Sequence, residues 1–144
     1  ENLTRDERAR QQGFDEIILL NERGEVAECT SANIFVVSGS RVWTPPLSAG
    51  CLPGVTRAVL LEDIDVPGLE IEERALTLND LEIADEVCIT SSTRALLPAA
   101  RIEGLQIPGG RSVCDRLQRA LAAHAAAYTA AHRKPAPAGV NITQ

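Results

Sequence analysis

Two stretches decide the fold of this chain: Glu28-Cys29-Thr30-Ser31-Ala32-Asn33-Ile34-Phe35 and, downstream, Leu52-Pro53-Gly54-Val55-Thr56-Arg57. The first places a lone carboxylate, Glu28, near the end of a predicted strand, and Asn33 then leads into an apolar strand at 34–37. The second is a Pro-Gly turn that runs directly into a predicted helix. Because a helix start leaves backbone N–H groups unpaired and carries partial positive charge, this turn is suited to bind an anion such as phosphate.

Short strands and helices alternate on both sides of these stretches. The run Ile17-Ile18-Leu19-Leu20 is typical of a strand buried on both faces. Many short strands with interspersed helices predict a mixed α+β domain with a barrel-like sheet, not a doubly wound one. The predicted strands cover 15–21, 26–28, 34–37, 42–44, 69–72, 86–90 and 105–107, and the predicted helices cover 3–12, 54–64, 77–83 and a final segment from 112.

Polar residues mark the starts of two predicted helices. Thr77-Leu78-Asn79-Asp80 has the pattern of a capping box, in which Thr77 and Asp80 each accept the other's backbone N–H. Ser112 is predicted to cap the final helix in the same way, with Asp115 closing the box.

Composition narrows the function classes. At 144 residues there is room for one domain with a sizeable core, and the net charge of −6 argues against nucleic-acid or anionic-membrane partners. No apolar run approaches the roughly 20 residues that a membrane span needs. The four cysteines are scattered without CxxC pairs. They could form two disulfides, but we expect reduced, mostly buried thiols in a cytoplasmic protein. No Cys/His set has metal-ligand spacing.

The two stretches, with Thr44-Pro45-Pro46 between them, closely resemble the class IV aminotransferases. These are fold-type IV pyridoxal-phosphate enzymes: branched-chain and D-amino-acid aminotransferases and aminodeoxychorismate lyase. Pyridoxal phosphate needs an acid near its ring nitrogen and a cradle for its phosphate. The resemblance covers roughly residues 1–133 and implies the C-terminal domain of the D-amino-acid-aminotransferase-like fold.

The resemblance also implies which residues bind the cofactor. Glu28 would hydrogen-bond the pyridine nitrogen, although a surface glutamate in a hairpin is the alternative. The backbone N–H groups of Val55 and Thr56, with the Thr56 hydroxyl, would cradle the phosphate, against the alternative of an ordinary helix start. Ser92 would supply a second phosphate-binding hydroxyl, unless it is only a turn serine bonded to nearby backbone.

Four further residues match the family less directly. Val42 would pack against the cofactor ring, or belong to the plain core. Thr93 would present its N–H to a substrate carboxylate. Asn33 and Arg57 belong to the family signature, and we interpret both as structural: Asn33 ties loops together and Arg57 pairs with a neighbouring acid.

Transamination requires a lysine that forms a Schiff base with the cofactor and moves the proton. In the family this lysine comes shortly before the helix predicted here at 3–12, so we expect it upstream of Glu1. The only lysine in the chain is Lys134, in a Pro/Ala-rich tail. We therefore expect residues 1–13 to lead from a missing N-terminal domain, 14–133 to form the cofactor-binding domain, and 134–144 to be a tail.

These features predict a fragment of a pyridoxal-phosphate aminotransferase that moves an amino group between an amino acid and a 2-oxo acid. The chain alone would be inactive, and its partners would be the N-terminal domain of the same protein and, by resemblance, a second subunit in a homodimer. Two alternatives stay open: a lyase of the aminodeoxychorismate type, and a non-catalytic binding or assembly module without its lysine.

Overall fold

The computed structural model describes residues 16–30, 32–91, 93, 95–132 and 139. The predicted helix at 3–12, Ser92 and the tail with Lys134 lie outside the described residues. In chain order the elements are β1 (Ile18–Leu20), β2 (Val26–Cys29), β3 (Ile34–Ser38), β4 (Arg41–Thr44), the 3-10 helix η1 (Leu47–Ala49), α2 (Val55–Glu62), β5 (Glu70–Glu73), α3 (Leu78–Ile83), β6 (Glu86–Thr90), β7 (Leu96–Pro98) and α4 (Ser112–Ala131).

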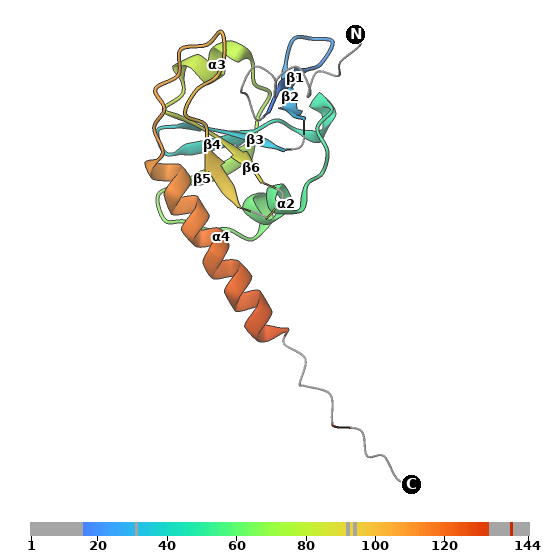
Figure 1. The fold of residues 1–144 in the computed structure, drawn as a ribbon, viewed down its shortest axis with the longest axis vertical. Helices are drawn as coiled ribbons and strands as arrows, with labels where there is room; N and C mark the ends of the chain where they lie inside the picture. The colour runs from blue at the N-terminus through green and yellow to red at the C-terminus, as the bar shows by residue number, and fades with distance from the viewer. Residues whose placement is uncertain (1–15, 31, 92, 94, 133–138, 140–144) are drawn as a thin grey trace.

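The strands form two sheets (Figure 1). The larger has five strands in the order β5-β4-β3-β6-β7, and β4 and β5 are its parallel pair. The smaller is the antiparallel hairpin of β1 and β2. The mixed α+β class is therefore confirmed. The described strands form an open sheet beside a hairpin, and they do not close into a barrel.

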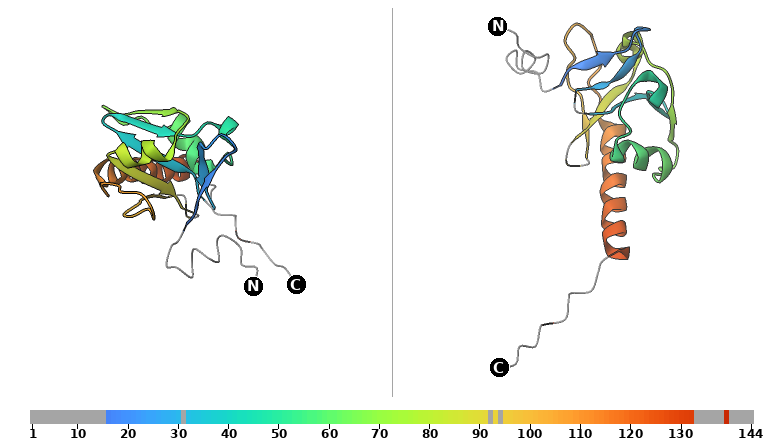
Figure 2. Two further views of the ribbon diagram at one scale, coloured as in Figure 1. Left: turned by 90° about the horizontal axis from the view of Figure 1, so that it is seen from above. Right: turned by 90° about the vertical axis from the view of Figure 1, so that its right-hand side faces the viewer.

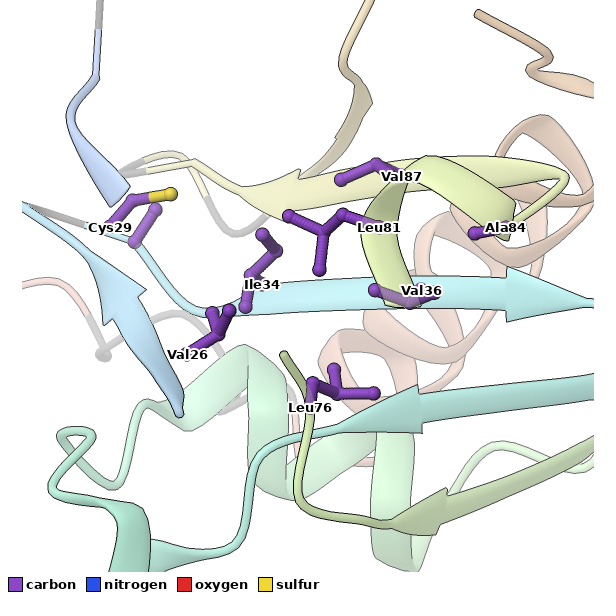
Figure 3. Close-up of a cluster of buried hydrophobic side chains, with 9 residues drawn as sticks. Val26, Cys29, Ile34, Val36, Leu76, Leu81, Ala84 and Val87 are labelled. Atoms are coloured by element: carbon purple, nitrogen blue, oxygen red, sulfur yellow. The ribbon is translucent and has the colours of Figure 1, made fainter. Parts of the chain in front are cut away.

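The central strand β3 is buried on both faces because helices cover both sides of the sheet. Ile34 and Val36 point into a cluster on one face, under α3, which contributes Leu81 (Figure 3). Phe35 and Val37 alternate with them and point to the opposite face. There they join a second cluster with α2 and α4, whose buried members are Val42, Leu60, Cys88, Leu96, Cys114, Leu117 and Leu121. This two-sided burial explains why β3 is a continuous apolar run.

Strand β1 differs from its prediction. Residues 17–19 are only half-buried, and the Leu20 side chain is 45% exposed. The reason is topological: β1 is an edge strand that pairs with β2 alone among the described strands. A short apolar run does not show by itself how many neighbours its strand will have.

The start of α3 confirms the predicted capping box. The Thr77 hydroxyl accepts the Asp80 N–H at 3.4 Å, and an Asp80 carboxylate oxygen accepts the Thr77 N–H at 2.8 Å. Each side chain therefore satisfies one of the backbone donors that a helix start leaves unpaired.

The start of α4 contradicts the predicted Ser112 cap. The N-cap is Arg111, and no side chain within the helix start caps it. Instead the buried Glu86 carboxylate, from β6, accepts the N–H groups of Val113 at 2.8 Å and Cys114 at 2.9 Å. Asp115 pairs with Arg111 at 3.1 Å and does not close a box. The prediction was wrong because an acceptor from a distant strand replaces the local one.

Helix α4 packs on the sheet only through its first half. Cys114, Leu117 and Leu121 are buried, whereas nearly every residue from 122 to 132 is exposed and the helix extends beyond the body of the domain (Figure 2). No helix in the described ranges combines the length and apolarity that a membrane span requires. The four cysteines are free and buried, which confirms the prediction of unpaired thiols.

Candidate functional site

The start of α2 offers unpaired backbone donors. Its N-cap is Gly54, which has no side chain to accept a hydrogen bond, and the first helical bond runs from the Ala58 N–H to the Gly54 carbonyl at 3.0 Å. The N–H groups of Val55, Thr56 and Arg57 have no acceptor among the described residues. Unpaired donors at the positive end of a helix form a site for an anion.

Glu28 lies next to this helix start. Its Oε2 accepts the backbone N–H of Leu52 at 3.1 Å, two residues before Gly54. Its Oε1 has no hydrogen-bond partner within the described part of the chain. The carboxylate is thus anchored by one oxygen, while the other oxygen remains able to accept a proton donor such as a protonated ring nitrogen.

Asn33 joins the same turn from the other side. Its side-chain Nδ2 donates to the Leu52 carbonyl at 3.0 Å, and its backbone N–H donates to the Thr90 hydroxyl at 2.9 Å. Asn33 is only 5% exposed. A Cβ added at Gly54 would collide with Asn33 Oδ1, so the turn packs directly against this side chain. The expectation that Asn33 ties loops together is confirmed.

Among the described residues, Thr90 at the end of β6 bonds to Asn33, which in turn bonds to the turn before α2. Ser92 lies outside the described residues. Thr93 is exposed, and its hydroxyl lies 2.9 Å from that of Ser91. The described hydrogen bonds do not join Thr93 to Glu28 or to α2, so the assigned roles of Ser92 and Thr93 stay predictions.

Val42 belongs to the buried core, and its assigned contact with the cofactor ring stays a prediction. It is 0% exposed and packs in the core cluster under α2 and α4, as the plain-core alternative expects. The apolar side chains that are exposed beside the acid are those of Leu52, at 67%, and Val55, at 58%. Sequence reasoning did not single out the side chain of Leu52. Its place immediately before the Pro-Gly turn was the available signal, but exposure is a tertiary property that this signal does not give.

Arg57, in the first turn of α2, connects this helix to two other segments of the domain. Its guanidinium forms an ion pair with Glu73 and donates from Nη2 to the Pro45 carbonyl at 3.0 Å. The prediction that Arg57 pairs with an acid is confirmed. Its Nε is buried without a hydrogen-bond partner, the one such side-chain atom in the described ranges.

Cys51 precedes the turn, and its thiol is unreactive. It is buried, and burial raises the pKa of its thiol, with the Arg57 charge acting in the opposite direction. Its sulfur lies 3.7 Å from the Pro45 carbonyl oxygen. A thiol held protonated in this way is a poor nucleophile and a poor metal ligand. No His/Cys/Asp/Glu group with metal-binding geometry occurs among the described residues.

The geometry fits one kind of ligand. The start of α2 can take an anion such as a phosphate group, and the free Glu28 oxygen can take a protonated nitrogen. Glu28 bonds to the N–H of Leu52, and Leu52 lies two residues before Gly54, the N-cap of α2. A small molecule that carries a phosphate at one end and a basic ring nitrogen at the other therefore matches the residues present.

Comparisons with known proteins agree with this arrangement. Residues 1–102 match the family "Amino-transferase class IV". The branched-chain-amino-acid aminotransferase of Escherichia coli (strain K12) is 32% identical over 114 residues, which are 78% of this chain and 37% of that protein.

Solved structures show the same fold. The branched-chain amino acid aminotransferase from Thermobaculum terrenum, in its PLP form, superposes with a TM-score of 0.77 at 26% identity, over 89% of this chain and 43% of the other. A putative 4-amino-4-deoxychorismate lyase from Legionella pneumophila gives 0.75 at 27% identity, over 82% and 44%. The chain thus spans about two fifths of the length of the relatives it matches. On this match it belongs to the class IV aminotransferase family.

Proposed function

We propose that the full-length protein is a pyridoxal-phosphate-dependent aminotransferase that moves an amino group between an amino acid and a 2-oxo acid. Family membership supports this activity. The observation that carries it is that the Glu28 carboxylate bonds to Leu52, two residues before the N-cap of α2, whose first three N–H groups have no acceptor among the described residues. Bound pyridoxal phosphate supplies an electron sink for the carbanion at the substrate carbon, and a protonated ring nitrogen strengthens that sink.

Each residue of the site then has a proposed role. The N–H groups of Val55 and Thr56, together with the Thr56 hydroxyl, hold the phosphate, and Ser92 adds a second hydroxyl. Glu28 keeps a proton on the ring nitrogen through its free oxygen. The exposed Leu52 side chain, not the buried Val42, is the candidate to cover the ring.

We further propose that the rest of the protein completes this site. Amino-group transfer needs a lysine amine beside the cofactor. The only lysine in this sequence is Lys134, in the tail. We therefore place the lysine that would bind the cofactor in the N-terminal domain, upstream of Glu1. Thr93 would meet a substrate carboxylate. The four free thiols support a reducing, cytoplasmic location, and the exposed side chains of Leu20, Leu47, Leu52 and Val55 support burial against another domain or a second subunit.

The test uses the full-length protein with pyridoxal phosphate and pairs of amino acids and 2-oxo acids. Glu28→Gln keeps the shape and the Leu52 contact but removes the charge, so amino-group transfer should fall about 100-fold. Glu22→Gln, in the exposed turn of the same hairpin, is the matched control and should match the unmodified protein. Equal activity of both variants and the unmodified protein would remove Glu28 from the site.

A lyase of the aminodeoxychorismate type is the second candidate function. The similarity to the putative 4-amino-4-deoxychorismate lyase of Legionella pneumophila favours it. The same preparation separates the two: release of pyruvate from aminodeoxychorismate indicates the lyase, and exchange of amino groups between acids indicates the aminotransferase. A protein that binds no cofactor would instead be a binding or assembly module.

A further inference from the structure

We propose that Asn33 is a positioning residue, which fixes the Glu28 carboxylate and the start of α2 at one separation through the backbone of Leu52. This inference rests on the proposed function, because it assigns Asn33 to the site where the ring and the phosphate would bind. We call the contacts of Glu28 and Asn33 with Leu52 the Leu52 junction.

The Leu52 junction uses both polar backbone groups of one residue. Glu28 accepts the Leu52 N–H at 3.1 Å, and Asn33 donates to the Leu52 carbonyl at 3.0 Å. With both groups held by side chains from the β2–β3 segment, the turn has little freedom to slide or rotate against that segment. The acid and the helix start are therefore fixed to the same short piece of chain.

Asn33 is itself held firmly enough to serve as the reference point. It is buried, its N–H donates to the Thr90 hydroxyl at 2.9 Å, and its carbonyl accepts the Thr90 N–H at 3.0 Å. Thr90 ends β6, immediately before the loop that carries Ser92 and Thr93. Asn33 thus bonds to two segments that carry proposed site residues, the turn before α2 and the end of β6, and it follows the third, β2, along the chain.

Gly54 completes the arrangement by leaving room for Asn33. Its backbone has φ −63° and ψ 148°, an extended conformation that any residue can adopt. Conformation therefore does not require glycine here. Space does, because a Cβ would collide with Asn33 Oδ1 and push the turn away from it. The amide of Asn33 and the missing side chain at Gly54 are complementary parts of one contact.

The first measurement follows amide hydrogen exchange at Leu52 in the full-length protein without cofactor. Asn33→Ala leaves the Leu52 N–H bonded to Glu28 but removes the bond to the Leu52 carbonyl, so the turn should open more easily. Exchange at Leu52 should then become about 10-fold faster, the value of one lost hydrogen bond. Asn79→Ala, at an exposed position of α3, is the control and should change nothing there. An unchanged Leu52 exchange rate in Asn33→Ala would overturn the positioning role, whatever the cofactor does.

The second measurement titrates pyridoxal phosphate into the same variants and follows its absorbance. Asn33→Ala and Gly54→Ala should each weaken binding about 10-fold, and the double variant should be no weaker than either single one, because both remove the same contact. A fully additive double variant, or a normal affinity in Asn33→Ala, would overturn the proposal. If the unmodified protein binds no pyridoxal phosphate while Leu52 exchange responds as expected, the proposed function fails and the Leu52 junction stands.

Discussion

Arg57 is buried in spite of its charge, and its guanidinium joins α2 to Pro45, just after β4, and to Glu73, at the end of β5. Replacing it with methionine keeps the volume but removes the guanidinium donor of the Pro45 carbonyl and leaves it the weaker thiol of Cys51. We expect Arg57→Met to lower the free energy of unfolding by about 1–3 kcal/mol, mostly through the lost hydrogen bond to this carbonyl, because the partner Glu73 is half exposed. Urea denaturation measures it, with Arg119→Met on the exposed side of α4 as control. Equal losses in both variants would contradict this account.

The buried thiol of Cys29, the residue next to Glu28, should make the stability of the domain depend on pH. Burial, followed by the charges of Glu16 and Glu28, raises its pKa from 9.0 to about 12. The raised pKa means that the unfolded chain loses this proton first, so its contribution to stability is complete below pH 9 and is lost as pH rises toward 12. At pH 10 the loss should be about 1.4 kcal/mol.

The measurement compares urea denaturation at pH 8 and pH 10. Cys29→Ala should show a correspondingly smaller fall between the two pH values than the unmodified protein, whatever its absolute stability. The other buried thiols are present in both proteins and cancel in the comparison. The same fall in both proteins would show that Cys29 does not titrate as described.

Sequence reasoning recovered the chemistry of single residues better than their surroundings. Asn33 and Arg57 were assigned structural roles, and both have the expected kind of partner. Val42 was assigned either to the cofactor ring or to the core, and it is buried in the core, while the exposed side chain of Leu52 was not singled out. Residue type predicts what a side chain can bond. Which apolar side chains remain exposed depends on how α2 and α4 cover the sheet, and no local pattern contains that information.

Helix α4 depends at its start on a carboxylate from another element. Glu86 accepts two backbone N–H groups there and lies near the Ser112 hydroxyl at 3.3 Å. We expect Glu86→Ala to cost about 2–4 kcal/mol of unfolding free energy, because two buried donors lose their acceptor. Glu86→Gln, which keeps one acceptor oxygen, should cost less.

Hydrogen exchange at residues 113–117 together with urea denaturation checks this prediction. Glu103→Ala, in the exposed turn before Leu105, is the matched control and should leave both readings unchanged. Fast exchange confined to the start of α4 is the expected pattern. Uniform loss of protection across the domain would mean that Glu86 supports the core and not the helix start.

The elements were largely predictable, since their signals are local. Strands β2, β3, β4 and β6 match the predicted strands, β5 matches the alternating run at 69–72, and the start of α3 follows its capping box. The strand predicted at 105–107 was wrong, because only an isolated bridge between Ile102 and Leu105 forms there. The short helix η1 was missed because Pro45-Pro46 ended the predicted strand and nothing beyond it was periodic. The Ser112 cap failed for the opposite reason: a plausible local signal was present, and Glu86 from the sheet displaced it.

The domain as a whole should bind a cofactor without being able to use it. We expect the 144-residue chain to catalyse no amino-group transfer, because the proposed site includes no lysine. Borohydride reduction of the full-length protein with pyridoxal phosphate, followed by peptide mapping, should attach the cofactor to a lysine outside residues 1–144. Attachment at Lys134 would contradict the proposal that the lysine that bonds the cofactor lies upstream of Glu1.

The Leu52 junction has one consequence for the stretch of chain that it spans. Strands β3 and β4 and helix η1 separate Glu28 from α2 in the sequence. The distance between Glu28 and α2 is nevertheless set by side-chain bonds to Leu52 and not by the length of the intervening chain. The exposed turn at Gly39-Ser40 could therefore be lengthened, or carry a grafted peptide or fluorescent label, without disturbing the ligand site. The hairpin of β3 and β4 is therefore a suitable site for attaching a peptide or a label.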